Sequence, residues 1–205
     1  MLLAVDSSTG TSVAVVDREG GILAERSDEN TVRHAEVVGA LIRDVLAEAG
    51  VAVADLSAVA CGMGPGPFTG LRIGIAAART FALGARKPVV PLVSHDAIAF
   101  GWYRDGHTGD LVVATDARRR ELYWSTYSGV TESGLPVRTA GPALAKPDDV
   151  PSRAGVRLDA TFVSAGALGM LAEQTWAAGA AFAADEPLYL RSPDVTLSTR
   201  KRVTA

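Results

Sequence analysis

The order of apolar runs along the chain is the feature that most narrows what it can fold into. Three short apolar runs, residues 2–5, 12–16 and 22–25, follow one another with only Gly- and Ser-containing turns between them. Short runs separated by tight turns predict an antiparallel meander. Helical and strand patterns then alternate, which predicts an α/β fold with a mixed sheet and helices on its faces.

The first predicted helix spans residues 33–49. Val38, Leu41, Ile42 and Val45 recur there at helical spacing. Thr31 or Asn30 can cap its start and Gly50 can end it. We expect the later strands at residues 57–62 and 89–93, with a helix capped by Ser94 running to residue 103.

The second predicted helix, residues 71–83, has one face that carries only glycine and alanine, which we call its small-residue face. It follows a stiff loop of glycines and prolines at residues 64–70, and we expect Gly84 to close it. Small residues recur every four positions and therefore share one face. That face lets another backbone come very close; its members are Gly70, Gly74, Ala78 and Ala82.

The opening of the chain recurs after a polar break at residues 105–110. Residues 111–116 resemble residues 2–6, and a strand at 121–127 again follows a turn. Such self-similarity is what two related lobes produce, so we expect one lobe at residues 1–104 and a smaller one at 105–205. The second lobe would continue through a Pro/Gly-rich stretch, a strand at 161–164, a helix at 167–178 and a basic, frayed tail at 199–202.

Composition excludes several classes of protein. The net charge is -3 and no long basic tract precedes the C-terminal end, whereas a chain that binds nucleic acid on its own normally carries a basic stripe. With one cysteine, Cys61, no intrachain disulfide can form, which fits a reducing cytoplasm. No apolar run approaches a membrane span and the N-terminus does not resemble a signal peptide. We therefore expect a cytoplasmic protein.

The turn after the first strand is one candidate site. Asp6, Ser7, Ser8 and Thr9 place an acid beside hydroxyl groups and exposed backbone N–H groups, which can hold a metal-bound nucleotide phosphate. A simple hairpin turn uses the same residue types. Both interpretations stay open from spacing alone.

The loop at residues 64–70 is the second candidate site. Gly64 and Gly66 leave backbone N–H groups uncovered before a helix N-terminus, where anions are favoured. The loop has no Walker lysine, so a tight strand-to-helix turn is the alternative.

The histidines and the arginine run are less informative. No two of His34, His95 and His107 have the i, i+4 spacing of helical metal ligands, so no metal site is predicted. The run of arginines at 118–120 is either a solvated turn or a small patch facing an anion or RNA.

These motifs resemble one family across nearly the whole chain. Residues 64–74 read GPGPFTGLRIG and resemble the Gly-Pro-Gly-Ser-Phe-Thr-Gly-Leu-Arg segment of TsaB (YeaZ-type) proteins. The N-terminal DSST at residues 6–9 resembles their Asp-Thr-Ser-Thr. His34-Ala35-Glu36, Asp116-Ala117-Arg118 and the segment PLYLR at 187–191 follow in the expected order. Pro67 and Ser8 depart from the family pattern or from that of nucleotide-binding relatives.

The resemblance implies a fold and a role. It implies two ribonuclease-H-like lobes of the actin/Hsp70/sugar-kinase type. It also implies a non-catalytic scaffold in the complex that forms threonylcarbamoyladenosine on tRNA, with a TsaD-type catalytic subunit and a TsaE-type ATPase as partners. The catalytic relative carries His-x-x-x-His for its metal, but here Val38 follows His34 by four residues. No intrinsic cofactor is expected; ATP or ADP would sit at an interface with partner subunits, and tRNA would be reached only through the complex.

We hypothesise that the two helices at 33–49 and 71–83 form the association surface. A four-helix contact with the partner would bury about 1,600 Å², and the same surface would form a homodimer when the partner is absent. The interface candidates are His34, Val37, Val38, Leu41, Arg72, Ile73, Gly74, Ala76 and Arg79. Three rival functions remain: a stand-alone actin-fold kinase or hydrolase, a metallopeptidase, and an interaction module unrelated to tRNA.

Overall fold

The computed structural model describes residues 1–151 and 155–191. The expected basic tail at 199–202 lies outside these residues. No helix in the described ranges combines the length and apolar character needed to cross a membrane.

The first sheet contains the expected meander and two further parallel strands. β1 pairs antiparallel with β2, and β2 pairs antiparallel with β3. On its other side β1 pairs parallel with β4, which pairs parallel with β5, giving the order β3-β2-β1-β4-β5. The strands are β1 (Leu2–Asp6), β2 (Thr11–Asp17), β3 (Gly21–Asp28), β4 (Ala58–Gly62) and β5 (Val89–Leu92).

The second sheet repeats this arrangement with four strands in the order β8-β7-β6-β9. Its first strand again pairs antiparallel with the next strand and parallel with the strand after the meander. The repeat expected from residues 2–6 and 111–116 is therefore present. The strands are β6 (Leu111–Asp116), β7 (Leu122–Val130), β8 (Pro136–Ala145) and β9 (Val156–Asp159).

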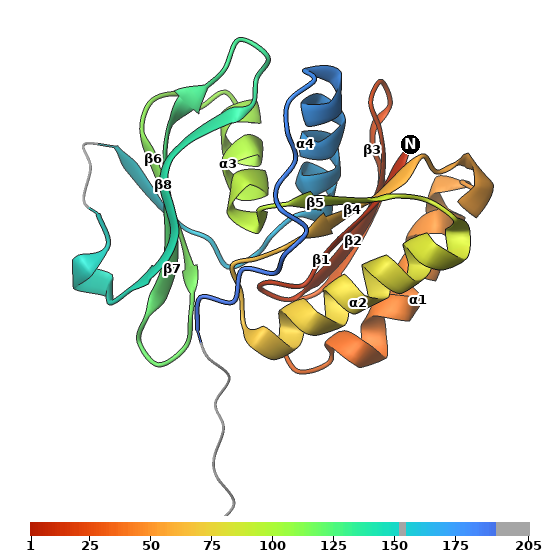
Figure 1. Cartoon of the computed structure of the whole chain (residues 1–205), viewed down its shortest axis with the longest axis horizontal. Helices are drawn as coiled ribbons and strands as arrows, with labels where there is room; N and C mark the ends of the chain where they lie inside the picture. The colour runs from red at the N-terminus through yellow and green to blue at the C-terminus, as the bar shows by residue number, and fades with distance from the viewer. Residues whose placement is uncertain (152–154, 192–205) are drawn as a thin grey trace, which may run out of the picture.

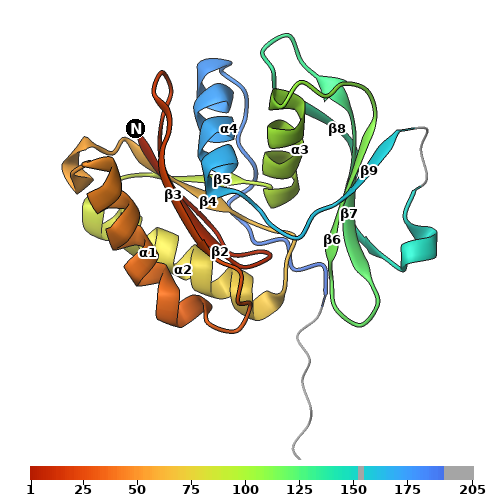
Figure 2. The same ribbon diagram turned by 180° about the vertical axis from the view of Figure 1, so that it is seen from behind.

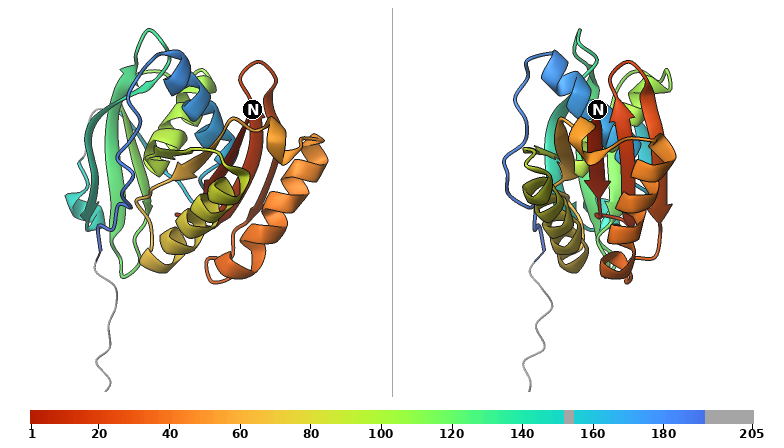
Figure 3. Two further views of the ribbon diagram at one scale, coloured as in Figure 1. Left: turned by 45° about the vertical axis from the view of Figure 1, so that its right-hand side comes forward. Right: turned by 90° about the vertical axis from the view of Figure 1, so that its right-hand side faces the viewer.

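The helices form two layers, which Figure 1 and the view from behind in Figure 2 show. One layer, α1 and α2, covers the outer face of the first sheet; the other, α3 and α4, lies between the two sheets (Figures 1–3). This arrangement confirms the expected α/β class with two mixed sheets flanked by helices. The helices are α1 (His34–Ala49), α2 (Phe68–Ala85), α3 (Ser94–Arg104) and α4 (Ala165–Ala177), with short 3₁₀ turns at Val53–Asp55 and Pro147–Asp149.

Alternating side chains of β1 build two separate cores. Leu3 and Val5 point to the side of α1 and α2, where they join Val38, Ile42 and other apolar residues. Leu2 and Ala4 point to the other side and pack with Leu168 and other residues of α4. Because both faces of this sheet are covered, β1 is apolar from Leu2 to Val5, as expected for a strand buried on both faces.

The two inner helices are exchanged between the lobes. α3 belongs by sequence to the first lobe but packs Ala99 against Tyr127 and Val113 of the second sheet. α4 belongs by sequence to the second lobe but packs on the first sheet. The sheets separate between α3 and β6, yet the helices cross that line, so the division at 104/105 stays a prediction.

Several local predictions were wrong for identifiable reasons. β8 lies inside the Pro/Gly-rich stretch at 135–155, where we predicted no strand. It is an edge strand and can therefore accommodate Pro136 and Pro142. Residues 161–164 are not a strand; Ser164 instead caps α4 by accepting the Ala167 N–H at 2.9 Å.

The expected helix caps were only partly right. Gly50 ends α1 in the left-handed conformation as expected. The residue before α1 is Arg33 and no side chain caps the helix there, so neither Thr31 nor Asn30 does so. α2 continues through Gly84 and ends at Ala85, with Arg86 as its left-handed C-cap.

Candidate functional site

The Asp6 carboxylate lies inside the protein, where other groups of the chain satisfy it. Its Oδ1 accepts hydrogen bonds from the Ser8 backbone N–H at 2.8 Å and the Ser8 hydroxyl at 2.5 Å. Its Oδ2 accepts one from the Ser94 hydroxyl at 2.5 Å. Asp6 is 2% exposed, and burial raises the pKa of its carboxyl although the hydrogen bonds from Ser8 and Ser94 oppose this shift.

Ser7 also faces inward, toward α2. Its hydroxyl donates to the Gly70 carbonyl at 2.8 Å. A Cβ atom on Gly74 would overlap the Ser7 hydroxyl, and one on Gly70 would lie 2.8 Å from the Ser7 carbonyl oxygen. The small-residue face of α2 therefore packs against the end of β1 within the same chain.

The loop before α2 is a tight strand-to-helix turn. Gly64 has φ of 94°, and its N–H donates to the Ser94 hydroxyl at 3.1 Å. A Cβ on Gly66 would lie 2.7 Å from the Ser8 Cα atom. These glycines let the loop approach the Asp6 turn, and the Gly64 N–H is not free to bind a phosphate.

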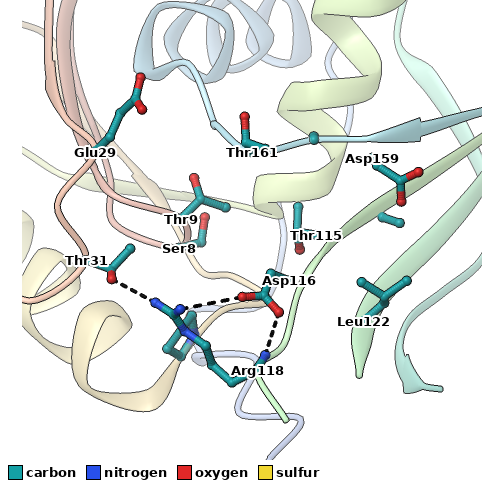
Figure 4. Close-up of a pocket in the computed structure, with 13 residues that line it drawn as sticks. Ser8, Thr9, Glu29, Thr31, Thr115, Asp116, Arg118, Leu122, Asp159 and Thr161 are labelled. Carbon is teal, nitrogen blue, oxygen red and sulfur yellow. Dashed lines mark hydrogen bonds and ion pairs between the residues drawn. The ribbon is translucent and has the colours of Figure 1, made fainter. Parts of the chain in front are cut away.

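A cavity of about 370 Å³ lies where the ends of the two sheets face each other (Figure 4). Hydroxyl and carboxylate side chains dominate its lining. Of the six residues predicted to bind a cofactor, only Ser8 and Thr9 line it. Asp6, Ser7, Gly64 and Gly66 are buried and do not line it, so their role as direct ligands stays a prediction. The lining residues are Ser8, Thr9, Glu29, Thr31, Pro67, Ala114, Thr115, Asp116, Arg118, Leu122, Asp159, Ala160 and Thr161.

Arg118 connects the two lobes at this cavity. Its guanidinium donates to the Thr31 hydroxyl at 2.8 Å and lies 3.6 Å from the Asp116 carboxylate (Figure 4). The three arginines at 118–120 all have positive φ, 64°, 53° and 61°, a conformation that is rare outside glycine. With Glu29, Asp116 and Asp159 also present, the lining is more acidic than basic.

His95 forms a buried polar contact behind the cavity wall. Its two ring nitrogens lie 2.9 Å from the Ser125 hydroxyl and 3.0 Å from that of Thr115, a cavity residue. Burial lowers the pKa of His95 to about 3, so the ring is neutral and connects α3 to the second sheet.

Three of the predicted interface residues are buried within the protein. His34 lies 2.8 Å from the Thr11 hydroxyl through its Nδ1 and is 4% exposed; burial lowers its pKa. Val38 belongs to the core beneath α1, and Gly74 packs on Ser7. These three residues occupy the inward faces of α1 and α2, and their direct contact with a partner stays a prediction.

The other predicted interface residues are on the outer faces of these helices. Arg72, Ala76 and Arg79 are exposed, and Val37, Leu41 and Ile73 are partly buried. Phe68, Thr69, Arg72, Ile73 and Ala76 surround a surface hollow of about 320 Å³.

The PLYLR segment at 187–191 lies beside α2 and the second sheet, which its sequence alone did not indicate. The Leu188 N–H donates to the Met63 carbonyl at 2.8 Å, and the Tyr189 ring lies 4.7 Å from that of Phe68. Arg191 forms an ion pair with Glu121 and donates to the Ala117 carbonyl at 2.8 Å. The motif therefore joins α2 to the turn that carries Arg118.

Residues that the sequence did not single out complete the site. Ser94 was expected to cap α3 but bonds Asp6, because β5 brings it beside the end of β1. Asp159 follows the pattern of an acid at a strand end, which a correct prediction of β9 would have revealed. Within residues 1–151 and 155–191, no group of three or more His, Cys, Asp and Glu side chains is arranged to hold a metal ion. Cys61 is buried, and burial raises its pKa to about 12.

The family model described as TsaD, tRNA N6-adenosine threonylcarbamoyltransferase, matches residues 5–189. An uncharacterised protein of Mycobacterium tuberculosis is 38% identical over 203 residues, covering 94% of this chain and 92% of that protein. The tRNA threonylcarbamoyladenosine biosynthesis protein TsaB of Escherichia coli is 32% identical over 152 residues, covering 74% of this chain and 65% of that protein.

Solved structures agree with the sequence matches. A Pseudomonas aeruginosa protein described as similar to the peptidase YeaZ superposes with a TM-score of 0.78 at 30% identity, covering 93% of this chain and 99% of that one. YeaZ from Pseudomonas aeruginosa gives 0.74 at 30% identity, covering 87% and 92%. From these matches and the fold, this chain belongs to the TsaB/YeaZ proteins of the TsaD family.

Proposed function

We propose that this chain is a non-catalytic scaffold subunit in the formation of threonylcarbamoyladenosine on tRNA. Its partner would be a TsaD-type threonylcarbamoyltransferase, in a complex with a TsaE-type ATPase. The protein named TsaB in Escherichia coli is described as a biosynthesis protein for this nucleoside, and the matching family model is described as the transferase itself.

The observation that carries the proposal is the outer face of α1 and α2. Arg72, Ala76 and Arg79 are exposed there, while Val37, Leu41 and Ile73 are only partly buried. Leu41 and Ile73 also pack against the core beneath the two helices. Arginine and aromatic residues, here Arg72 and Phe68 on α2, are enriched in surfaces that bind another protein. A partner that offers two helices would complete a four-helix contact, and a second copy of the chain would use the same face when no partner is present.

The Asp6 turn supports a scaffold more than an enzyme. Its carboxylate, the Ser7 hydroxyl and the Gly64 N–H all bond within the chain. A phosphate would have to displace buried hydrogen bonds, and each buried group left unpaired costs about 1–3 kcal/mol. We therefore place ATP or ADP at the interface with the partner subunits. Since the net charge is -3, we expect tRNA to be bound through the complex.

Reconstitution tests this function. The chain, its TsaD-type partner and the ATPase are purified separately and combined with tRNA, ATP and threonylcarbamoyl-adenylate as the group donor. Threonylcarbamoyladenosine on tRNA is then quantified with the chain present or omitted. We expect modification only in the complete mixture. Equal modification without the chain would contradict the scaffold role. An Ala76→Asp variant should reduce modification because it places a charge on the exposed face of α2.

One observation favours a second function, a stand-alone nucleotide-dependent enzyme. The cavity between the sheets, about 370 Å³, lies in the size range of ligand sites. Steady ATP turnover by the isolated chain, abolished by Ser8→Ala, would support this rival. Turnover that appears only with the partner would support the scaffold.

A further inference from the structure

Two arginines on the outer face of α2 differ in whether a carboxylate of the chain already pairs with them. Arg72 and Arg79 lie seven residues apart, which is about two helical turns, so they share that face. Both were candidates for the partner interface, and sequence spacing cannot distinguish them. Their contacts within the chain do.

Arg79 is held by the chain itself. Its guanidinium donates to the Asp185 carboxylate at 2.7 Å and to the Asp185 carbonyl at 3.0 Å. Asp185 belongs to the segment after α4 that runs beside α2 to Tyr189 (Figure 1). The positive charge of Arg79 therefore anchors this segment and has a carboxylate of its own.

Arg72 has no carboxylate partner among the described residues. Its guanidinium carbon lies 5.3 Å from the centre of the Phe68 ring, a cation–π distance. The Phe68 ring in turn contacts Tyr189, which is 39% exposed. Phe68 thus holds the guanidinium beside the hollow of about 320 Å³, whose other walls include Ile73 and Ala76.

A cation next to an apolar hollow indicates which groups a binding partner would place there. Arginine and aromatic residues near the centre of an interface contribute most of the binding energy. Resting on the proposed function, we infer that Arg72 pairs with a carboxylate of the partner subunit, whose neighbouring apolar side chain fills the hollow. Arg79 is a positioning residue for the chain's own C-terminal segment.

The surroundings favour a protein carboxylate over a nucleotide phosphate. The hollow presents one guanidinium and mainly apolar or aromatic walls. A nucleotide di- or triphosphate carries several charges, which proteins usually meet with more donors and a metal ion. A single carboxylate beside an apolar side chain matches both features of this hollow.

Matched alanine variants test the assignment. Wild type, Arg72→Ala, Arg72→Lys and Arg79→Ala are titrated with the TsaD-type partner by calorimetry, at about 0.05 M and about 0.5 M NaCl because salt screens exposed charges. We expect Arg72→Ala to weaken binding at least about tenfold and to reduce its salt dependence. Arg72→Lys should retain part of the affinity, and Arg79→Ala should bind within about twofold of wild type.

A second readout separates the structural role of Arg79. We expect Arg79→Ala, and not Arg72→Ala, to speed proteolysis after residue 180, because that segment loses its anchor. Wild-type affinity and salt dependence in Arg72→Ala, with wild type binding normally, would overturn the inference and leave the proposed function standing. Failure of wild type to bind the partner would overturn both. A loss in Arg72→Ala seen only when ATP or ADP is added would assign Arg72 to a phosphate instead.

Discussion

The two lobes place an aspartate at the same point of the same topology and give it opposite environments. Asp6 ends β1 and is 2% exposed; Asp116 ends β6 and is 66% exposed. Asp6 is surrounded by Ser8 and Ser94, whereas Asp116 pairs with Arg118 at the protein surface. Strand order alone therefore does not determine what such an acid can do.

The difference comes from what packs against each turn. The first sheet has a fifth strand, β5, which delivers Ser94 to Asp6, and α2 closes over Ser7. Within the described part of the chain, the second sheet ends at β9 and has no strand equivalent to β5. A repeated fold thus uses one turn to stabilise the structure and leaves the other facing the cavity.

The largest expected effect concerns the two aspartates. Asp6→Ala leaves the Ser8 N–H and the Ser94 hydroxyl buried without their acceptor, so we expect a loss of about 2–3 kcal/mol in the free energy of unfolding. Asp116→Ala removes an exposed ion pair and should cost less than about 0.5 kcal/mol. Urea unfolding followed by circular dichroism measures both. Equal losses would break the contrast between the lobes.

Two glycines of α2 test how closely this helix packs against the Asp6 turn of the first lobe. Gly74→Ala forces a Cβ into the Ser7 hydroxyl, and we expect it to destabilise the protein by about 1–3 kcal/mol. Gly84→Ala, in the same helix, has open space at the Cβ position and should stabilise by about 0.5–1 kcal/mol. Thermal unfolding distinguishes them. A Gly74→Ala variant as stable as wild type would show that the Ser7 turn can shift away from α2 at little cost in free energy.

The contact between α3 and the second sheet should respond to pH. Burial lowers the pKa of His95 from 6.5 to about 3, so the unfolded chain binds a proton that the folded chain does not between these values. Stability is therefore lost as pH falls from about 6.5 toward 3, by up to about 1.4 kcal/mol per pH unit. His95→Gln keeps partners for Ser125 and Thr115, and its unfolding free energy, measured by urea at several pH values, should fall less steeply. An identical slope would contradict this role of His95.

A smaller effect than those of Asp6→Ala and Gly74→Ala is expected at the link between Arg118 and Thr31. Arg118→Ala removes an exposed bond between the lobes and should cost about 0.5–1 kcal/mol. Arg118→Gly loses the same bond but relieves the positive φ, so its net cost should be smaller. The midpoint of thermal unfolding measures both variants. A larger cost for glycine than for alanine would contradict the conformational argument.

The sequence predicted the elements whose signals are local. Apolar periodicity identified the meander and α1, and the resemblance of residues 64–74 identified the family. β8 was missed because proline and glycine in an edge strand look like a loop, and β9 was missed with it.

The site was harder to predict because its contacts join distant residues. The bond of Ser94 to Asp6 spans 88 positions, and that of Arg79 to Asp185 spans 106. Nothing near Gly74 in the sequence indicates whether the small-residue face of α2 contacts a partner protein or the first sheet of the same chain. That choice depends on how closely β1 approaches α2, which only the folded structure gives.

The packing of α4 on the first sheet affects how the chain folds while it is being synthesised. The face of the first sheet that carries Leu2, Ala4, Ala14 and Val16 is covered by α4, which ends at Ala177. A ribosome adds about 5–20 residues per second, so this apolar surface stays bare for several seconds after β5 has been synthesised. Newly made chains therefore pass through a stage at which chaperones can bind them, and a message truncated before α4 would yield an aggregating product rather than a free first lobe.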